Sequence, residues 1–222
     1  MRASRLFLLR MLVAVAGGCI SSPAAPQNAD IGPNADTPGG DTLRVNFSNQ
    51  AAASESDILL MATVAGQVLG KAGITVRWSF CFDQFSQRPA DSSCIEKPDV
   101  PVFFLTLVED SRTNEQKGLG LAVLGTGRAS VYYRRAETLA KGMGNVSAGQ
   151  ILGYAAVHEI VHLILASHDH SASGLMRSGW KRGELRDIGQ NHFSLTRSES
   201  SIVRRALAQR TLMFAQATKP HN

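Results

Sequence analysis

Two spacings of apolar residues run along the chain, and together they predict a mixed α+β fold. Five segments alternate or run apolar in the manner of strands: residues 42–47, 74–82, 100–108, 118–123 and 129–134. Three stretches instead have helical spacing, beginning at Ser54, Ser147 and Thr196. The second and third begin with a capping box, Ser147 with Gln150 and Thr196 with Glu199. The predicted order is strand, helix, four strands, helix, loop and helix.

The N-terminal region has the composition of an export signal followed by a tether. Arg2, Arg5 and Arg10 accompany an apolar run at residues 11–16, so we expect residues 1–19 to be a bacterial signal peptide. The run is shorter than the roughly 20 apolar residues that a permanent membrane span needs. Residues 20–41, rich in Ser, Pro, Ala and Asn, read as a disordered linker. Residues 42–216 then form one catalytic domain, and 217–222 a flexible tail.

The three cysteines indicate how the exported protein is processed. Cys19 closes a segment that resembles a lipobox, although Ala16 stands where Leu is usual, so lipidation at Cys19 and ordinary cleavage are both open. Lipidation would attach the protein to a membrane. Cys81 and Cys94 are then left as a disulfide pair, with two separate buried thiols as the alternative. We expect a secreted, periplasmic or lipid-anchored protein.

The charge of the chain excludes one class of partner. Removing the three arginines of the predicted signal lowers the formal net charge from +5 to +2. The sequence has no basic stripe with interleaved aromatic residues, so we expect no nucleic-acid partner. We expect a monomer.

The second helical stretch, which begins at Ser147, contains the residues with the clearest chemistry. His158 and His162 lie four residues apart, which places both imidazoles on one face of a helix where they can bind one zinc ion. Glu159 lies beside them and can act as a general base toward a zinc-bound water, whose pKa the metal lowers to about 7. The alternative for the two histidines is a pair of core residues without a metal.

The residues that follow make this segment resemble the metzincin zinc peptidases. His168 completes the spacing H-E-x-x-H-x-x-x-x-x-H, and Met176 follows as closely as the Met-turn does in the matrixin branch. The resemblance implies a mixed twisted sheet of about five strands, an active-site helix, a preceding helix and a C-terminal helix. It also implies that an edge strand directly precedes the active-site helix. Tyr132 and Tyr133 would lie on that strand, where a peptide substrate can add.

One position departs from the family pattern and leaves the third zinc ligand open. Leu165 stands where the family has Gly, whose positive φ lets the chain leave the helix. A longer helix would move the turn to residues 167–169 and favour His170 over His168. Residues 170–177 are also similar to a group of uncharacterised bacterial exported proteins that carry the later histidine. The third ligand is therefore His170 or His168.

The sequence thus predicts a zinc-dependent metalloendopeptidase. In it, Glu159 is the general base, three histidines hold the zinc ion, and the substrate is a peptide or protein. Two alternatives use the same residues. One is a non-catalytic, zinc-stabilised envelope or adhesion protein whose site both His168 and His170 would close, and the other is a zinc amidase that acts on cell-wall material.

Overall fold

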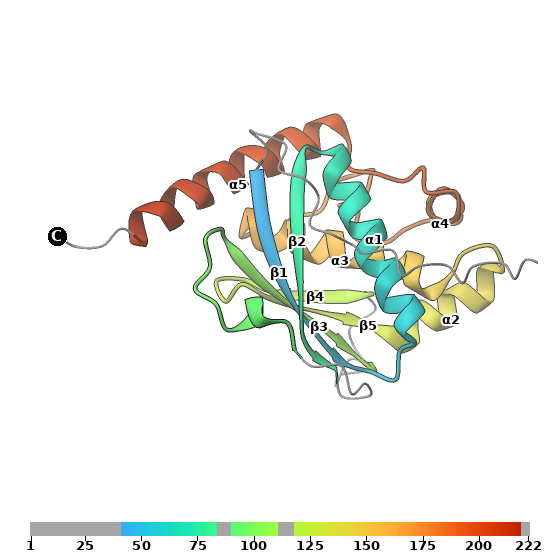
Figure 1. The fold of residues 1–222 in the computed structure, drawn as a ribbon. Coiled ribbons are helices and arrows are strands. Elements are labelled where there is room, and N and C mark those ends of the chain that lie inside the picture. The colour runs from blue at the N-terminus through green and yellow to red at the C-terminus, as the bar shows by residue number, and fades with distance from the viewer. Residues whose placement is uncertain (1–40, 84–89, 111–117, 219–222) are drawn as a thin grey trace, which may run out of the picture. The chain divides into compact units, whose positions relative to one another are not determined.

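Five strands form one mixed sheet in the computed structural model, which describes residues 41–83, 90–110 and 118–218 (Figure 1). All of these residues fall within one unit of the chain, Asn34–Asn222. The strand order is β2-β1-β3-β5-β4, and β4 alone is antiparallel, to β5. The strands are β1 (Asp41–Gln50), β2 (Ile74–Asp83), β3 (Val102–Val108), β4 (Gly120–Val123) and β5 (Arg128–Tyr132). The sheet therefore ends at β2 on one side and at β4 on the other.

Five α-helices accompany the sheet in the described part of the chain. They are α1 (Glu55–Lys71), α2 (Tyr133–Met143), α3 (Ala148–Leu165), α4 (Arg182–Gly189) and α5 (Arg197–Ala217). Capping boxes begin α3 and α5, as the sequence predicts. α3 is long and apolar enough to cross a membrane by length and composition alone, but 83% of it is buried inside the fold. We therefore describe α3 as the core helix.

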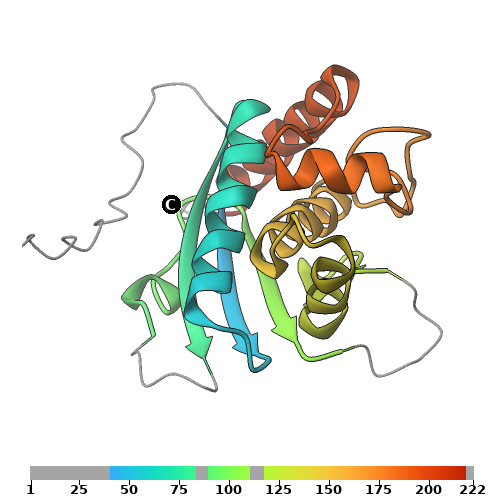
Figure 2. The ribbon, with the colours of Figure 1, turned by 90° about the vertical axis from the view of Figure 1, so that its right-hand side faces the viewer.

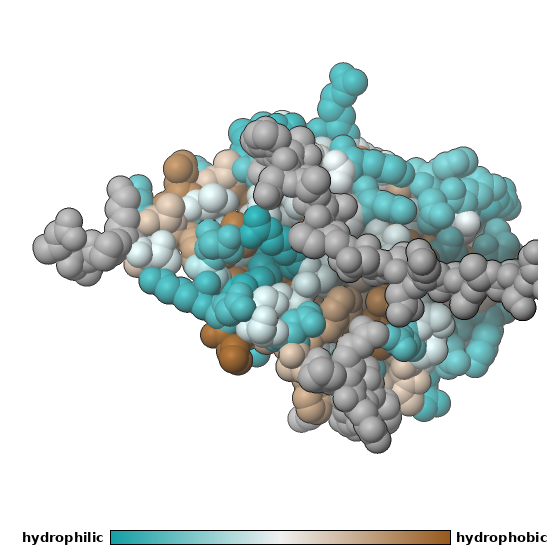
Figure 3. Space-filling model, in the orientation of Figure 1, coloured by the Kyte–Doolittle hydropathy of each residue, from teal (hydrophilic) through white to brown (hydrophobic). Residues whose placement is uncertain are grey.

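The main core lies between the sheet and the pair α1 and α3. These two helices lie side by side, and each also contacts the sheet (Figure 2). Alternate residues of β1, namely Leu43, Val45 and Phe47, are at most 1% exposed and point toward the helices. On the visible face of the molecule, apolar residues form only small separate patches in a mainly hydrophilic surface (Figure 3). The apolar residues are thus concentrated where the sheet meets the helices.

Residues 91–96 contact polar groups on the other face of β1 and β2. Cys81 on β2 and Cys94 form a disulfide with a Cα–Cα distance of 5.5 Å. Asp91, at the start of the 3-10 turn Ser92–Cys94, accepts a hydrogen bond from the Phe80 backbone through Oδ2 at 2.6 Å. Asp91 therefore pairs both backbone groups of Phe80, which lies on the end strand β2 and would otherwise leave them unpaired.

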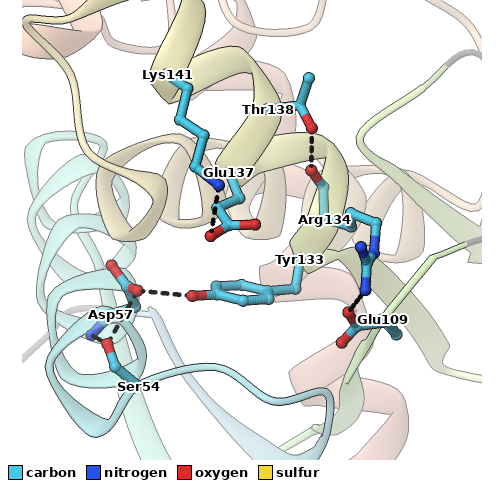
Figure 4. A network of polar contacts seen from close by, with 8 residues as sticks. All are labelled: Ser54, Asp57, Glu109, Tyr133, Arg134, Glu137, Thr138 and Lys141. Atoms are coloured by element: carbon cyan, nitrogen blue, oxygen red, sulfur yellow. Dashed lines mark hydrogen bonds and ion pairs between the residues drawn. The ribbon is translucent and has the colours of Figure 1, made fainter.

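Asp57 on α1 connects this helix to α2 and α3, and Figure 4 shows its contact with α2. Its carboxylate accepts hydrogen bonds from the Tyr133 hydroxyl on α2 and from the Gly149 backbone N–H in the first turn of α3, both at 3.1 Å. A carboxylate at a helix N-terminus is favoured by the helix dipole. Burial, together with the hydrogen bond to Asp57, raises the pKa of Tyr133 to about 12.

The predicted fold class is confirmed, with two corrections. The sequence patterns missed α2 and α4, because α2 was read as the end of a strand and α4 has only eight residues. The prediction that an edge strand directly precedes the active-site helix is wrong. β5 lies inside the sheet between β3 and β4, α2 separates it from α3, and the edge strand is β4. Tyr132 ends β5 and Tyr133 begins α2, so neither lies on the edge.

Candidate metal centre

Three histidine side chains converge at the C-terminal half of α3. The Nε2 atom of His158 lies 3.0 Å from that of His162 and 3.3 Å from that of His170. The possible ligand atoms of all three residues lie within 4.8 Å of one another. Three nitrogen ligands of a tetrahedral zinc ion, each about 2.0–2.1 Å from the metal, lie roughly 3.3–3.4 Å apart. The group therefore has the size that a zinc ion needs.

Hydrogen bonds set the tautomers of His158 and His162 for metal binding. Nδ1 of His158 donates to the Leu175 carbonyl at 2.9 Å, and Nδ1 of His162 donates to the Ser167 carbonyl at 2.7 Å. Because Nδ1 carries the proton in both rings, both Nε2 atoms hold free lone pairs that point toward each other. Burial lowers the pKa of both histidines, that of His158 to about 4. Both rings are thus held neutral, which is the form that binds a metal.

The chain leaves α3 one residue later than in the family pattern. Leu165 is the last helical residue, and Ala166 takes the left-handed conformation with φ 51° and ψ 38°. The expectation that the turn would come at residues 167–169 is therefore wrong by one position. The turn directs the Ser167 carbonyl back to His162 and brings His170 to the other two histidines. His168 is exposed, its ring centroid lies 5.8 Å from that of His162, and it falls outside the three-residue group.

Glu199 on α5 fixes the loop that carries His170. Its Oε1 atom accepts hydrogen bonds from the Ser171 hydroxyl at 2.5 Å and from the Met176 backbone N–H at 3.2 Å. Its Oε2 atom accepts from the Thr196 backbone N–H at 2.7 Å, as part of the helix cap. Gly174 has φ +82°, and a Cβ there would lie 2.7–2.8 Å from Thr196 and Glu199. One buried carboxylate therefore holds both the loop and the start of α5.

Met176 and Trp180 lie on the loop that follows the histidines. Met176, the residue predicted to form a Met-turn, is 3% exposed and belongs to the core. The Trp180 ring lies 6.4 Å from the His158 ring, and its Nε1 donates to the Leu175 carbonyl at 3.1 Å. The Leu175 carbonyl thus accepts from both His158 and Trp180, which fixes the two rings relative to each other.

Glu159 lies against the edge strand β4. Its side chain is 6% exposed, and burial raises the pKa of the carboxyl to about 8, while a hydrogen bond from the Ala122 backbone opposes the rise. A Cβ on Gly120 would lie 2.6 Å from Cγ of Glu159 and 2.8 Å from the Ser130 carbonyl. Gly120 therefore leaves the space that the Glu159 side chain occupies.

A cleft of about 1030 Å³ passes over the three histidines and Glu159. One wall is β4 with the residues just before it, and the others are the inner side of α2 and residues 177–185. His168 and Trp180 also line the cleft. Since β4 is an end strand, its outer edge faces an open space large enough for an extended peptide.

Sequence reasoning missed two residues of this site. Glu199 was assigned only to a helix cap, because its distance of 29 residues from His170 along the chain gives no sign of their contact. Gly120 carried a usable signal, since a glycine inside a strand often marks the close approach of another group. The structure also leaves His192 exposed and Tyr154 in the core, away from catalytic roles. Cys19 lies outside the described residues.

Comparison with known proteins identifies the fold. No model of a protein family matches the sequence, and no curated protein matches it. Solved structures do match. A zinc-dependent peptidase from Methanocorpusculum labreanum has a TM-score of 0.50 at 13% identity, covering 72% of this chain and 99% of that one. Archaemetzincin from Methanopyrus kandleri has a TM-score of 0.50 at 12% identity, covering 78% and 99%.

These two matches show that the chain has a metzincin-like α+β fold. Their identity is too low to transfer an activity, so the function must be argued from the side chains. The three-histidine group can bind zinc, and its donors are the imidazole nitrogens that zinc commonly takes in proteins.

Proposed function

We propose that this protein is a zinc-dependent metallopeptidase. The observation that carries the proposal is the arrangement of His158, His162 and His170. Their ligand atoms converge, and two of the rings are fixed as neutral tautomers by backbone carbonyls. Glu159, buried beside this group in an open cleft, supplies the one further residue that a hydrolytic site of this kind needs. The fold shared with zinc-dependent peptidases supports the same function.

The chain's own groups divide the work of peptide hydrolysis between them. When bound by the three histidines, zinc supplies a Lewis acid that polarises a carbonyl oxygen and lowers the pKa of water. Glu159 accepts the proton of the attacking water through its carboxylate and then delivers a proton to the leaving amine. A nearby cation favours the carboxylate form that this base requires. The buried position of Glu159 keeps its side chain in a fixed direction.

The edge of β4 would bind the substrate backbone. β4 ends the sheet and lines the cleft, so a peptide can pair with it as an additional strand. Gly120 keeps Glu159 close to this strand, which places the base next to the substrate backbone. The substrate class is therefore a peptide or an extended segment of a protein.

Two observations favour a catalytic over a structural zinc site. Within the described residues, the ligand group has three members and His168 is outside it, so a tetrahedral ion would keep one position for water or substrate. Glu159 also lines the cleft, and a structural site would not need a carboxylate there. A zinc amidase would use the same chemistry. It would differ from a peptidase in its substrate, so the experiment below includes cell-wall fragments.

The test combines zinc content with hydrolysis of a quenched peptide library and of cell-wall fragments. We expect His170→Ala to lose zinc and His168→Ala, the matched control, to retain it. We expect Glu159→Gln to retain zinc and lose peptide hydrolysis. Equal activity of Glu159→Gln and wild type would refute the assigned base. Zinc loss on His168→Ala alone would refute the ligand set, and cleavage of cell-wall fragments alone would identify an amidase.

We also propose that the protein works outside the cytoplasm. The disulfide between Cys81 and Cys94 supports this, because disulfides persist in oxidising compartments. Mapping of the mature protein by mass spectrometry without reduction should find this link and a new N-terminus, at Cys19 after lipoprotein processing or near Ala16 or Ala24 after ordinary cleavage. An intact N-terminus with free thiols at both positions would contradict the proposal.

A further inference from the structure

One end of the cleft carries two arginines, of which Arg177 has one long ion pair and Arg182 has no partner among the described residues. Arg177 and Arg182 both line the cleft. The Nη1 atom of Arg177 lies 3.6 Å from Oε1 of Glu184, which is too long for a hydrogen bond. Glu184 uses its other oxygen to accept from the Lys181 backbone at 2.6 Å. Arg182 is exposed, and the described residues offer it neither a hydrogen bond nor an ion pair.

The arginines at the α2 side of the same cleft are different. Arg134 donates to Glu109 at 2.6 Å, as Figure 4 shows, and Arg135 donates to Asp110 at 2.7 Å. These two guanidinium groups are already paired with carboxylates of the chain. Residues 177–184 contain three basic residues and one acidic residue, Glu184, so a net positive charge remains at this end of the cleft.

The local backbone increases this positive potential. Lys181 and Arg182 stand at the start of α4, where the helix dipole is positive and acidic residues are the usual choice. Glu184 is the one acidic residue in this first turn. Placing basic residues here costs free energy in the empty protein, and a bound anion would offset that cost.

This basic segment lies next to the metal centre. Trp180, between the two arginines in sequence, has its ring 6.4 Å from that of His158. Trp180 and Leu185 give the same part of the cleft an apolar wall. A peptide bound across the histidines would therefore meet an apolar surface and then the arginines within a few residues of its scissile bond.

We propose that Arg177 and Arg182 select substrates that carry a carboxylate within three residues of the scissile bond. The carboxylate would lie on the part of the substrate that faces the cleft wall formed by residues 177–185. The inference rests on the proposed peptidase function and names its substrate class. Each guanidinium offers five N–H donors in a planar fork that matches a carboxylate with two hydrogen bonds. The carboxylate is either an Asp or Glu side chain or the C-terminus of a peptide, because the arginines bind both in the same way.

The experiment compares matched peptides on matched variants. Quenched peptides carry Glu or Gln at each of three positions on either side of the scissile bond, and each is made as the free acid and as the C-terminal amide. The proteins are wild type, Arg177→Gln, Arg182→Gln and the double variant. The control is Arg186→Gln, which removes the same charge from an exposed position on α4 outside the cleft. Zinc content is measured for each variant.

We expect wild type to prefer Glu over Gln on one side of the scissile bond by about tenfold in kcat/KM. Each single variant should reduce that preference, and the double variant should abolish it with little change on Gln peptides. Arg186→Gln should keep it. Preference for free acids over amides, without a Glu preference, would identify the peptide C-terminus as the carboxylate. No preference in wild type, or equal loss in Arg186→Gln, would overturn the inference.

Binding separates this result from the proposed function. The same peptides, labelled with a fluorophore, are titrated into zinc-loaded Glu159→Gln protein, which binds without cleaving. A carboxylate preference in binding that the double variant lacks supports the inference even when no peptide is cleaved. Cleavage of Gln peptides that depends on Glu159, without any carboxylate preference, retains the peptidase and overturns the inference.

Discussion

Replacing Glu199 tests how the protein holds His170, the proposed third zinc ligand. Among the described residues, no hydrogen bond joins Glu199 to the three histidines, but Glu199 accepts hydrogen bonds from Ser171 and Met176, which flank the loop after His170. Through Leu175 the same loop also orients His158. We therefore expect Glu199→Ala to weaken both the fold and zinc binding, for separable reasons.

The expected magnitudes follow from the burial of the groups left behind. Met176 is 3% exposed, so its backbone N–H would lose its acceptor inside the protein, at a cost of about 1–3 kcal/mol. Loss of half of the capping box of α5 costs about 1 kcal/mol more. The free energy of unfolding should thus fall by about 2–4 kcal/mol. Loss of groups that position metal ligands typically lowers metal affinity by about 10–100-fold.

Two neighbouring variants separate the two effects. Ser171→Ala removes the 2.5 Å hydrogen bond to the loop and leaves the cap of α5 intact. Thr196→Ala removes the hydroxyl that caps α5 and leaves the loop contacts intact. Urea unfolding without zinc measures stability, and competition with a chelator measures zinc affinity of the folded protein. If Glu199→Ala and Thr196→Ala are equally destabilised and both keep wild-type zinc affinity, Glu199 is only a helix cap.

Three further predictions concern two substitutions and the titration of the tyrosines. Ala166→Gly should raise the free energy of unfolding by about 0.5–1 kcal/mol, since glycine adopts the φ of 51° without strain; a fall in the urea midpoint would contradict this. Gly120→Ala should cost about 1–3 kcal/mol and most of the peptidase activity, because its Cβ would meet Glu159 at 2.6 Å; the control Gly66→Ala, with no atom within 4 Å of its Cβ, should retain both. The pKa values of all three tyrosines are raised, those of Tyr133 and Tyr154 to about 12, chiefly by burial. Since these folded-state pKa values exceed the unfolded value of 10.0, the phenols contribute their full stability below pH 10 and lose it as the pH rises toward 12. The phenolate absorbance of the native protein at pH 10 should therefore stay well below half of its full value, and a normal titration of the native protein would contradict the burial.

The elements in which apolar residues recur at a regular spacing over many residues could be predicted from the sequence. The four parallel strands, the helices α1 and α3, and the first half of α5 pack one face against the core, and that face sets the spacing of their residues. α4 has only two buried residues, Leu185 and Ile188, which is too few to reveal a period. α2 has the helical spacing of Ala136, Leu139, Ala140 and Met143, but it follows β5 without a turn residue between them. Sequence patterns also give no strand order, so β5 was mistaken for the edge.

The third ligand shows what local sequence determines and what it leaves to packing. The motif determines that His158 and His162 share a face, because helix geometry alone places residues four apart together. Which histidine becomes the third member of the group depends on where the helix ends. One additional helical residue rotates the direction in which the chain leaves the helix by roughly 100° and moves that point by about 1.5 Å along the axis. With Leu165 still helical and the left-handed turn at Ala166, the chain needs two more residues to return to the site, which brings His170 rather than His168 to the other two. Alanine does not favour this conformation by itself. The turn is held instead by the Ala166 N–H on the Leu163 carbonyl and by the hydrogen bond from His162 to Ser167, so the ligand set is chosen by contacts that only the folded chain makes.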